Sequence, residues 1–525
     1  MAHHANAEYT DRKRDENFTL LQAFEWYTKG GGKHWKKFNE ISKELSLAGI
    51  TAYWISPPTK AANPSSVGYD IYDLWDLGEF DQKGGAATKY GTKDDLVAMI
   101  NEARRNGIVV YIDAVLNHKF GADDVEKFRA SAVDSNDRTQ DVGEQHNIKG
   151  WTGFSFPGRQ GKYSELNWCF NHFTGVDYDD RSKETTIFRI QGDGKTWAAH
   201  VDGENQNYDF LMGADIDHNH PEVEKDMLDW GTWVLKEVDP FEFETSHGTD
   251  EKIKTGAQGF RFDAIKHISR DFIAKFVQHV RETSGSSHMF AVGEYWKDSI
   301  DDLDTYLSEL GTQFSVFDTP LHYNFKKAGE QGSSYDMRQI FDGTVVQKRP
   351  IDAVTLVDNH DTQVGQSLES CVPSWFKPLA YALILYRPDG YPCVFWGDLY
   401  GCEGPEGNPQ PPVSQLADFV RARKLFAYGE IRDYWDHPNC LGWVRVGDEW
   451  HDGCAIVMCN GDEGFKWMEV GKEHAGETWT DVLGWHQGEV KINEDGWGEF
   501  KCPARSVGVW TRQDARGREE FSTCK

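Results

Sequence analysis

The chain has 525 residues, of which 39% are hydrophobic and 27% are charged, a composition typical of soluble globular proteins. At roughly 100–200 residues per domain this length allows two to four domains, although a barrel enzyme can exceed ~250 residues as one domain. The formal net charge is −29, from 85 acidic and 56 basic residues, so a surface that binds nucleic acid or anionic membranes is not expected. No apolar run approaches the roughly 18–20 residues that a membrane span requires.

The nine cysteines are odd in number and scattered, with no C-x-x-C pair, so neither a zinc site nor a thioredoxin-like redox site is indicated. The opening sequence MAHHANAEYTDRKRDENFTLLQ contains no apolar stretch of ~7–15 residues of the kind that a secretory signal carries. Free thiols are a liability in oxidising compartments. These observations predict a cytoplasmic protein without a structural disulfide. The alternative is a mature secreted form whose leader has been removed.

Eight short runs rich in β-branched or aromatic residues are predicted to be strands. Their nearly continuous apolar character is typical of strands buried on both faces of a parallel sheet. In chain order they are Leu20–Phe24, Thr51–Ser56, Ile108–Asp113, Gly259–Asp263, Phe290–Glu294, Phe314–Phe317, Val354–Asp358 and Cys393–Gly397.

One intervening helix is predicted from its capping signals. Thr92 and Asp95 have the spacing of a capping box, an apolar stripe follows from Leu96 to Ala103, and Gly107 is expected to stop the helix. Eight strands that alternate with helices favour a (β/α)8 barrel over a doubly wound sheet.

Two regions break this alternation. Residues 117–221 are rich in Gly, Asp, Asn and aromatic residues with little helical period, and are predicted to form an irregular β-rich domain inserted after the third strand. Residues 428–525 contain short alternating runs and are predicted to form an antiparallel β domain. The barrel would then consist of residues 1–116 and 222–427. The polar, acidic segment Lys236–Gln258 is predicted to be a surface loop.

Three carboxylates follow strand ends of the predicted barrel. They are Asp263, Glu294 and Asp361, and Arg261 stands two residues before Asp263, on the same side of its strand. Active sites of such barrels lie at the C-terminal ends of the strands. Like charges held together cost energy, and paired carboxylates suit glycoside hydrolysis, with one nucleophile or base and one acid.

Four stretches carry a family resemblance: DAVLNH at 113–118, GFRFDAIKH at 259–267, AVGEYW at 291–296 and VDNHD at 357–361. Together with flanking stretches such as LQAFEWY at 21–27 and GWGEF at 496–500, they resemble the alpha-amylases of glycoside hydrolase family 13. The sequence around them also resembles the liquefying bacterial type and its intracellular fungal relatives. The resemblance extends over about residues 18–512.

The resemblance implies roles for the catalytic group. Asp263 would be the nucleophile, Glu294 the general acid and then the base, and Asp361 the residue that stabilises the oxocarbenium-like sugar. Arg261 would keep Asp263 ionised, since a neighbouring positive charge lowers a carboxylate pKa.

The resemblance also implies a set of substrate contacts. His118 and His360 would hydrogen-bond the same sugar and Tyr69 would stack on it. Lys266 and Trp296 would lie on the leaving-group side.

A structural calcium site is implied in the same way, since Ca²⁺ prefers six to eight hard oxygen ligands. Asn117, Asp209, Asp215 and the backbone oxygen of His267 match the family's site between barrel and inserted domain. Some relatives carry a further calcium–sodium–calcium cluster. Two Asp positions of that cluster hold Thr174 and Ala198 here, and Asp217 alone remains, so this cluster is not expected.

The resemblance thus implies an endo-acting, retaining alpha-amylase, expected to be a monomer, that acts on internal α-1,4-glucosidic bonds of starch, glycogen or maltodextrin. Two alternatives stay open. A glucanotransferase on the same fold would use the same covalent intermediate but pass the sugar to another sugar hydroxyl. A non-catalytic glycan-binding protein would be favoured only if one of the three carboxylates were missing.

Overall fold

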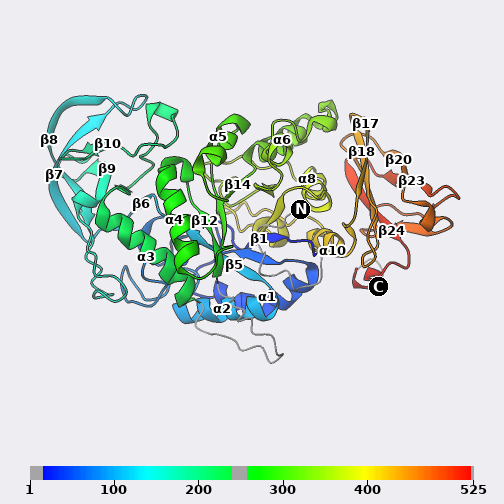
Figure 1. The fold of residues 1–525 in the computed structure, drawn as a ribbon, viewed down its shortest axis with the longest axis horizontal. Coiled ribbons are helices and arrows are strands. Elements are labelled where there is room, and N and C mark those ends of the chain that lie inside the picture. Colours follow the sequence, from blue (N-terminus) through cyan, green and yellow to red (C-terminus); the bar gives the residue numbers. More distant parts are fainter. Residues whose placement is uncertain (1–15, 239–256, 522–525) are drawn as a thin grey trace.

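The computed structural model describes residues 16–238 and 257–521. At its centre, eight parallel strands close into a barrel, in the order β1-β16-β15-β14-β13-β12-β5-β2 (Figure 1). The fold is therefore a (β/α)8 barrel, and all eight predicted strand runs are confirmed. The barrel strands are β1 (Leu20–Gln22), β2 (Ala52–Trp54), β5 (Val109–Ala114), β12 (Ala257–Phe262), β13 (Phe290–Gly293), β14 (Ser315–Phe317), β15 (Ala353–Leu356) and β16 (Tyr391–Phe395).

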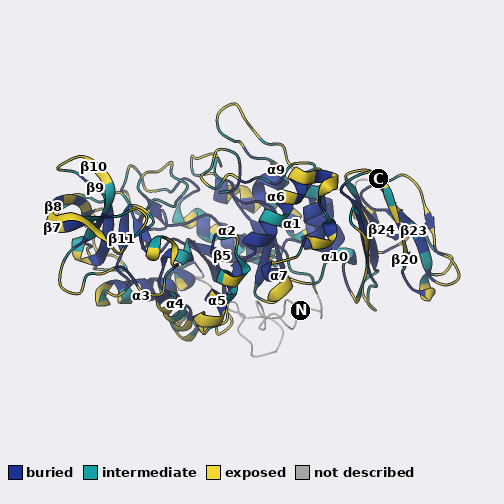
Figure 2. Ribbon diagram, turned by 90° about the horizontal axis from the view of Figure 1, so that it is seen from above, coloured by how far each residue is buried: buried dark blue, intermediate teal, exposed yellow. Residues whose placement is uncertain are grey.

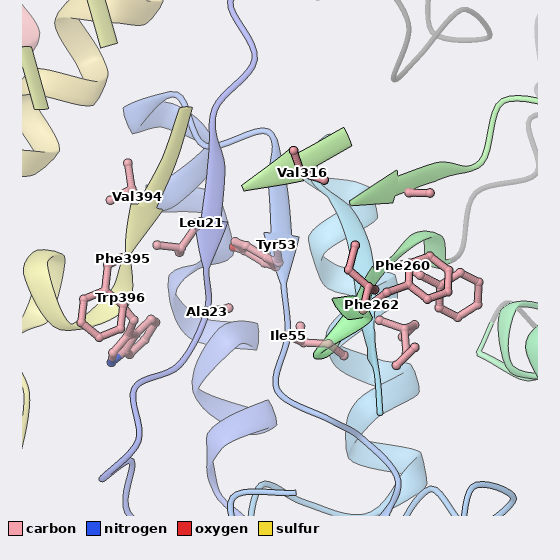
Figure 3. Close-up of a cluster of buried hydrophobic side chains, with 14 of the residues drawn as sticks. Leu21, Ala23, Tyr53, Ile55, Phe260, Phe262, Val316, Val394, Phe395 and Trp396 are labelled. Atoms are coloured by element: carbon pink, nitrogen blue, oxygen red, sulfur yellow. The ribbon is translucent and has the colours of Figure 1, made fainter. Parts of the chain in front are cut away.

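The apolar runs are continuous because each strand is buried on both sides. Leu20 and Trp54 belong to a cluster that fills the barrel interior. Their neighbours Leu21 and Tyr53 belong to the layer between the strands and the surrounding helices, part of which is drawn in Figure 3. Successive side chains of a strand point to opposite faces, so both faces need apolar residues here.

The helices surround this barrel, and exposed residues lie on the outer sides of the helices, on the connecting loops and on the outer parts of the two flanking sheets (Figure 2). The predicted capping box is confirmed: the Thr92 side chain accepts from the backbone N–H of Asp95, and Gly107 follows the helix with a left-handed φ of 76°. The helices are α1 (His34–Ala48), α2 (Lys93–Arg105), α3 (Pro221–Glu237), α4 (Arg270–Thr283), α5 (Ile300–Leu310), α6 (Thr319–Gln331), α7 (Val345–Lys348), α8 (Lys377–Tyr386), α9 (Trp396–Tyr400) and α10 (Leu416–Phe426). Within the described ranges, none of them has both the length and the apolar character to span a bilayer.

The chain between β5 and α3 forms a six-stranded antiparallel sheet, in the order β6-β11-β9-β10-β7-β8, on one side of the barrel (Figure 1). It is more regular than the composition suggested, because β7 and β8 form a long hairpin. Its strands are β6 (His118–Lys119), β7 (Asp124–Val133), β8 (Asp141–Gly153), β9 (Phe173–Asp179), β10 (Glu184–Ile190) and β11 (Ala214–Ile216). A short pair, β3 (Lys60–Ala61) and β4 (Ile71–Asp73), follows β2.

The C-terminal part is antiparallel, as predicted, and lies beside α8 and α10 on the side of the barrel away from the inserted sheet (Figure 1). It has a six-stranded sheet of β17 (Ile431–His437), β18 (Cys440–Arg445), β19 (Cys454–Cys459), β24 (Ser506–Arg512), β21 (Thr478–Asp481) and β22 (Val490–Lys491), and a two-stranded sheet of β20 (Gly464–Glu469) and β23 (Trp497–Cys502).

The predicted surface loop Lys236–Gln258 lies mostly outside the described residues. At its ends, α3 continues to Glu237 and β12 already begins at Ala257, so the connection between these elements is shorter than expected.

Candidate active site

Parallel strands bring the three predicted carboxylates to one end of the barrel. Asp263 directly follows β12, Glu294 directly follows β13, and Asp361 lies in the segment after β15. All three follow the C-terminal ends of their strands, the end where barrel active sites form. Their side chains are only 11%, 7% and 19% exposed, so their charges are poorly solvated.

Arg261 on β12 joins this group. Its Nη1 lies 2.8 Å from Oδ1 of Asp113 and 2.7 Å from Oδ1 of Asp263. Its Nη2 forms an ion pair with Oε2 of Glu294. The side chain is fully buried. A planar guanidinium with several fixed donors can hold carboxylates in a defined relative position, so Arg261 fixes Asp263 and Glu294 close to each other.

Asp113 was not among the predicted site residues, yet it anchors the group. Its Oδ2 accepts hydrogen bonds from Nε1 of Trp54 and from the hydroxyl of Tyr69, both at 2.8 Å. Burial raises the pKa of Asp113 to about 6, while the Arg261 charge opposes that rise. The only sequence signal for Asp113 was its place at the start of the stretch DAVLNH. A carboxylate within a strand is ordinarily part of a structural ion pair or hydrogen bond, so it does not by itself indicate a functional residue.

The buried environment raises the pKa of two of the three carboxyl groups, those of Glu294 and Asp361. Burial raises the pKa of Glu294 to about 7; Arg261 lowers it, and the charges of Asp263 and Asp113 raise it further. Burial and the Glu294 charge raise the pKa of Asp361 well above its usual range. A carboxyl group whose pKa lies near neutral pH can donate a proton to a leaving group, which is the behaviour of a general acid.

Each of the two predicted histidines has one ring nitrogen without a hydrogen-bond partner among the described residues, and that of His360 lies 3.4 Å from Oδ2 of Asp361. Nε2 of His118 donates to the backbone oxygen of Tyr69 at 2.8 Å, which leaves Nδ1 as an acceptor. Nδ1 of His360 accepts from the side-chain amide of Gln22 at 2.9 Å, so its Nε2 carries the proton. Both remaining nitrogens are buried without a hydrogen-bond partner among the described residues. Burial lowers the pKa of both histidines, so both are neutral near pH 7.

Tyr69 lies in a stack of rings beside the carboxylates. Its ring lies 5.0 Å from that of His360 and 6.0 Å from that of Trp26, with interplanar angles of 14° and 4°. The bond to Asp113 fixes its hydroxyl. The predicted stacking residue is thus brought to the site. Trp26 belongs to this group of rings, and Gln22 supports it through its hydrogen bond to His360. Neither residue was identified from the sequence, although both belong to the quoted stretch 21–27.

Lys266 and Trp296 lie next to each other, with Nζ of Lys266 3.5 Å from the backbone oxygen of Trp296. The ammonium of Lys266 lies 3.5 Å from Oε2 of Glu204 and 4.8 Å from the centre of the Tyr208 ring. Trp296 is 8% exposed, and its Nε1 donates to the hydroxyl of Tyr323 at 3.0 Å. The indole N–H of Trp296 is therefore already occupied by a protein partner.

The predicted calcium ligands form a second buried cluster, where β5 leads into the inserted sheet. Nδ2 of Asn117 lies 3.3 Å from Oδ1 of Asp215, while its Oδ1 has no partner among the described residues. Burial and the charge of its acidic neighbour Asp217 raise the pKa of Asp209 to about 7, with opposing hydrogen bonds. His267 is held by Tyr208, the residue before Asp209, through Nδ1 at 2.7 Å. Close carboxylates beside an unsatisfied amide oxygen fit a hard cation.

At the positions of the further cluster, which is not expected here, protein groups already bond the carboxylates. The hydroxyl of Thr174 donates to Oδ2 of Asp215, and the backbone N–H of Ala198 donates to Oδ2 of Asp209 at 2.8 Å. Asp217 forms an ion pair with Lys195 at 2.6 Å. An ammonium therefore already compensates the remaining carboxylate.

A separate group, His172, His220 and Glu222, has ligand atoms within 4.8 Å of one another and could hold a metal ion. However, Nδ1 of His172 accepts from the backbone N–H of Cys169 at 3.0 Å, which places the ring proton on Nε2, facing Glu222 at 3.4 Å. A metal at Nε2 would require the other tautomer. The hydrogen bonds favour a histidine–carboxylate contact.

Comparison with known proteins agrees with this geometry. The family described as "Alpha amylase, catalytic domain" matches residues 43–427, and "Alpha-amylase C-terminal" matches residues 455–511. The chain is 46% identical over 500 residues to an alpha-amylase of Bacillus licheniformis, covering 95% of this chain and 94% of the relative. It is 42% identical over 509 residues to the cytoplasmic alpha-amylase of Escherichia coli (strain K12), covering 95% and 99%.

Among solved structures, an Anoxybacillus alpha-amylase shares the fold with a TM-score of 0.61 and 15% identity, covering 95% of this chain and 99% of that one. The extent of the family match and the identity to near full-length relatives lead to one conclusion: the chain belongs to the alpha-amylase family of glycoside hydrolases.

Proposed function

We propose that the chain is an endo-acting, retaining alpha-amylase that hydrolyses internal α-1,4-glucosidic bonds in starch, glycogen or maltodextrin. The observation that carries the proposal is the joint attachment of Asp263 and Glu294 to one buried guanidinium, that of Arg261. Two carboxyl groups held close together suit the retaining mechanism, in which they lie ~5–5.5 Å apart, rather than the wider spacing of inverting enzymes.

In the first step, a carboxylate oxygen of Asp263 bonds to the anomeric carbon while the glycosidic bond to the leaving sugar breaks. Glu294 gives its proton to the leaving oxygen and becomes a carboxylate. Its pKa of about 7 makes the proton available near neutral pH. The ion pair with Arg261 holds the carboxylate of Asp263 in a fixed position for this attack.

In the second step, water replaces Asp263 at the anomeric carbon. Glu294 takes a proton from the attacking water and returns to its starting form. Asp361 stabilises the positive charge that develops on the sugar ring, and this charge in turn favours the ionised form of Asp361. His118 accepts from and His360 donates to sugar hydroxyls through the nitrogens that lack partners, and Tyr69 stacks on the same sugar. We place Lys266 and Trp296 on the leaving-group side.

We propose one structural Ca²⁺ held by Asn117, Asp209, Asp215 and the backbone oxygen of His267. Bound there, it would supply positive charge to buried carboxylates and join the barrel to the inserted sheet. The unsatisfied Oδ1 of Asn117 supports the assignment. The Lys195–Asp217 ion pair supports a single ion, because it occupies the carboxylate that a further site would need.

We propose further that the domains divide as expected, with a barrel of residues 1–116 and 222–427, an inserted domain of 117–221 and a C-terminal domain of 428–525. The starts of α3 at Pro221 and β17 at Ile431 support these limits. We propose a monomer in the cytoplasm. The likeness to the cytoplasmic relative and the free thiols of the eight described cysteines support that location.

Product analysis on a long maltooligosaccharide over time tests the function. Internal cleavage yields a range of intermediate lengths first. One dominant short product from the start would contradict endo action, and products longer than the substrate would favour a glucanotransferase. The Glu294→Gln chain is the control for contaminating activity.

A further inference from the structure

Asp361 is held differently from the other two carboxylates of the site. Arg261 fixes Asp263 and Glu294 through ion pairs, and among the described residues it forms no such pair with Asp361. Asp361 lies in the segment 357–376, all of it described, which forms neither helix nor strand between β15 and α8. Irregular segments are ordinarily mobile, whereas a group that stabilises a transition state must keep a defined position. Contacts within the segment must therefore hold Asp361.

Two side chains of this segment bond its backbone reciprocally. The side-chain oxygen of Asn359 accepts from the backbone N–H groups of Asp361 at 2.8 Å and Thr362 at 2.9 Å. The hydroxyl of Thr362 in turn accepts from the backbone N–H of Asn359 at 3.0 Å. This is the pattern of a capping box, which ordinarily starts a helix, yet the described residues that follow, up to 376, form none. The box instead fixes the turn 359–362, which carries both His360 and Asp361.

A buried charge orients the Thr362 hydroxyl. The hydroxyl donates to Oδ1 of Asp358 at 3.1 Å, which leaves a lone pair of its oxygen for the N–H of Asn359. Oδ2 of Asp358 pairs with the ammonium of Lys377 on α8 at 2.8 Å, and this ammonium also pairs with Asp398 on α9 at 2.5 Å. Thr362 and Asp358 are 0% and 2% exposed, so water hardly competes for these bonds. The turn is thereby anchored to two helices outside the barrel.

We propose that Thr362 is a positioning residue for the reaction, which holds the Asp361 carboxylate where positive charge develops on the sugar. This inference rests on the proposed function. Thr362 is fully buried, so it acts only through the backbone of the turn 359–362. A purely structural role would use the same hydrogen bonds. It would make stability depend on the hydroxyl, but not the stabilisation of the transition state.

Removal of the hydroxyl separates these two roles. Thr362→Val removes it and nearly keeps the side-chain shape. A displacement of about 1 Å can cost about a hundredfold in rate, so kcat should fall roughly 10- to 100-fold, with KM changed less than about threefold. Thr362→Ser keeps a hydroxyl and should recover most of this loss. Thr362→Ala should repeat the valine result, so the test does not depend on the folding of one variant.

Binding of a glucose-like iminosugar gives a readout that a structural role would not change. Its protonated ring nitrogen carries the charge that the sugar acquires in the transition state, so its affinity for Thr362→Val should fall in parallel with kcat/KM. Maltotriose is neutral, and its affinity should change little. This affinity is measured by calorimetry in chains that also carry Glu294→Gln, which cannot consume the ligand.

Thr511→Val is the matched control. Thr511 is also fully buried, and its hydroxyl donates to the backbone oxygen of Gly453 at 2.9 Å in the C-terminal sheet, remote from the carboxylates. The same change of side chain there should lower Tm, as Thr362→Val should. It should leave kcat and the affinity for the iminosugar unchanged.

A Thr362→Val chain with wild-type kcat would overturn the proposal. A lower Tm with unchanged iminosugar affinity would do the same, and so would a Thr362→Ser chain as slow as Thr362→Val, because the hydroxyl would then not be the group that matters. Normal hydrolysis by the wild-type chain together with any of these results refutes this inference alone. Absence of wild-type hydrolysis, or normal turnover by Asp361→Asn, refutes the proposed function and this inference with it.

Discussion

The protein concentrates buried carboxylates in two places, and the two differ in how their charge is compensated. Around the catalytic group, the guanidinium of Arg261 contacts Asp113, Asp263 and Glu294 directly. Around Asp209 and Asp215, the described residues supply no ammonium or guanidinium within ion-pair distance, and the nearby Lys195 pairs with Asp217 instead. The first cluster carries its own cation and leaves carboxyl groups free for chemistry. The second lacks such a partner among the described residues, which is why we propose that it takes a cation from solution.

Loss of a carboxylate in the first cluster should have the largest effect. Glu294→Gln should reduce kcat by at least about 10²–10⁴-fold while substrate binding remains, because acid catalysis is lost but sugar contacts stay. Asp263→Asn should cost at least as much, since no nucleophile remains. Steady-state kinetics and binding of a maltooligosaccharide measure both. Near-wild-type turnover by either variant would refute the assignment. A crystal structure of the wild-type chain should show the carboxyl groups of Asp263 and Glu294 ~5–5.5 Å apart.

Removal of the cation should affect the second cluster and hardly the first. An ion present at a thousand times its Kd stabilises the folded state by about 4 kcal/mol, so chelation should lower Tm by several degrees. Asp215→Asn should lower Tm and abolish the response to chelator, whereas Asp113→Asn should keep that response. Elemental analysis should give one Ca²⁺ per chain. Two or more ions near Thr174 and Ala198 would show that these substitutions were misread.

A smaller effect concerns pH dependence. The general acid must be protonated, so kcat/KM should fall as pH rises through the Glu294 pKa of about 7. The Asp113 charge helps to raise that pKa, so Asp113→Asn should lower it and move the alkaline limb of the pH–rate profile to lower pH. Asp481→Asn, at a buried carboxylate of the C-terminal sheet, should leave the limb in place. A limb that moves to higher pH in Asp113→Asn would contradict this electrostatic account.

The smallest effect concerns the cysteines. Cys459 and Cys502 lie with their sulfur atoms 3.0 Å apart in the C-terminal part, yet all eight described cysteines are free. Thiol titration of the denatured, unreduced protein should give nine thiols, the number in the sequence. Seven or fewer would mean that a disulfide forms and that the argument for a reducing compartment fails.

Sequence patterns predicted the barrel well because its strands are buried on both faces, which produces runs such as Thr51–Ser56 that stand out from polar surroundings. They predicted the inserted region poorly. Its long hairpin has one exposed face, and residues 141–147 of β8 are all exposed, so its composition resembles that of loops. Strand ends also indicated Asp263 and Glu294, because a carboxylate directly after a buried strand is noticeable, and Asp361 lies in the short segment after β15.

The supporting residues could not be found in the same way. Asp113 lies inside a strand, and Gln22 and Trp26 belong to the first strand and its following loop, more than 200 residues from the carboxylates in the chain. Their roles depend on contacts that only barrel closure creates, such as the bond from Gln22 to His360. The Lys195–Asp217 ion pair is a similar case, because nothing in the sequence around either residue indicates that the two are in contact.

The anomeric form of the first product tests the central claim most directly, that Asp263 and Glu294 act as the close pair of a retaining enzyme. Proton NMR of fresh hydrolysate, recorded before mutarotation, distinguishes the two forms. The account predicts that the new reducing ends are α at the earliest times and that the β form appears only later by mutarotation. New ends that are β from the start would contradict the covalent intermediate at Asp263, and with it the roles derived from the Arg261 cluster.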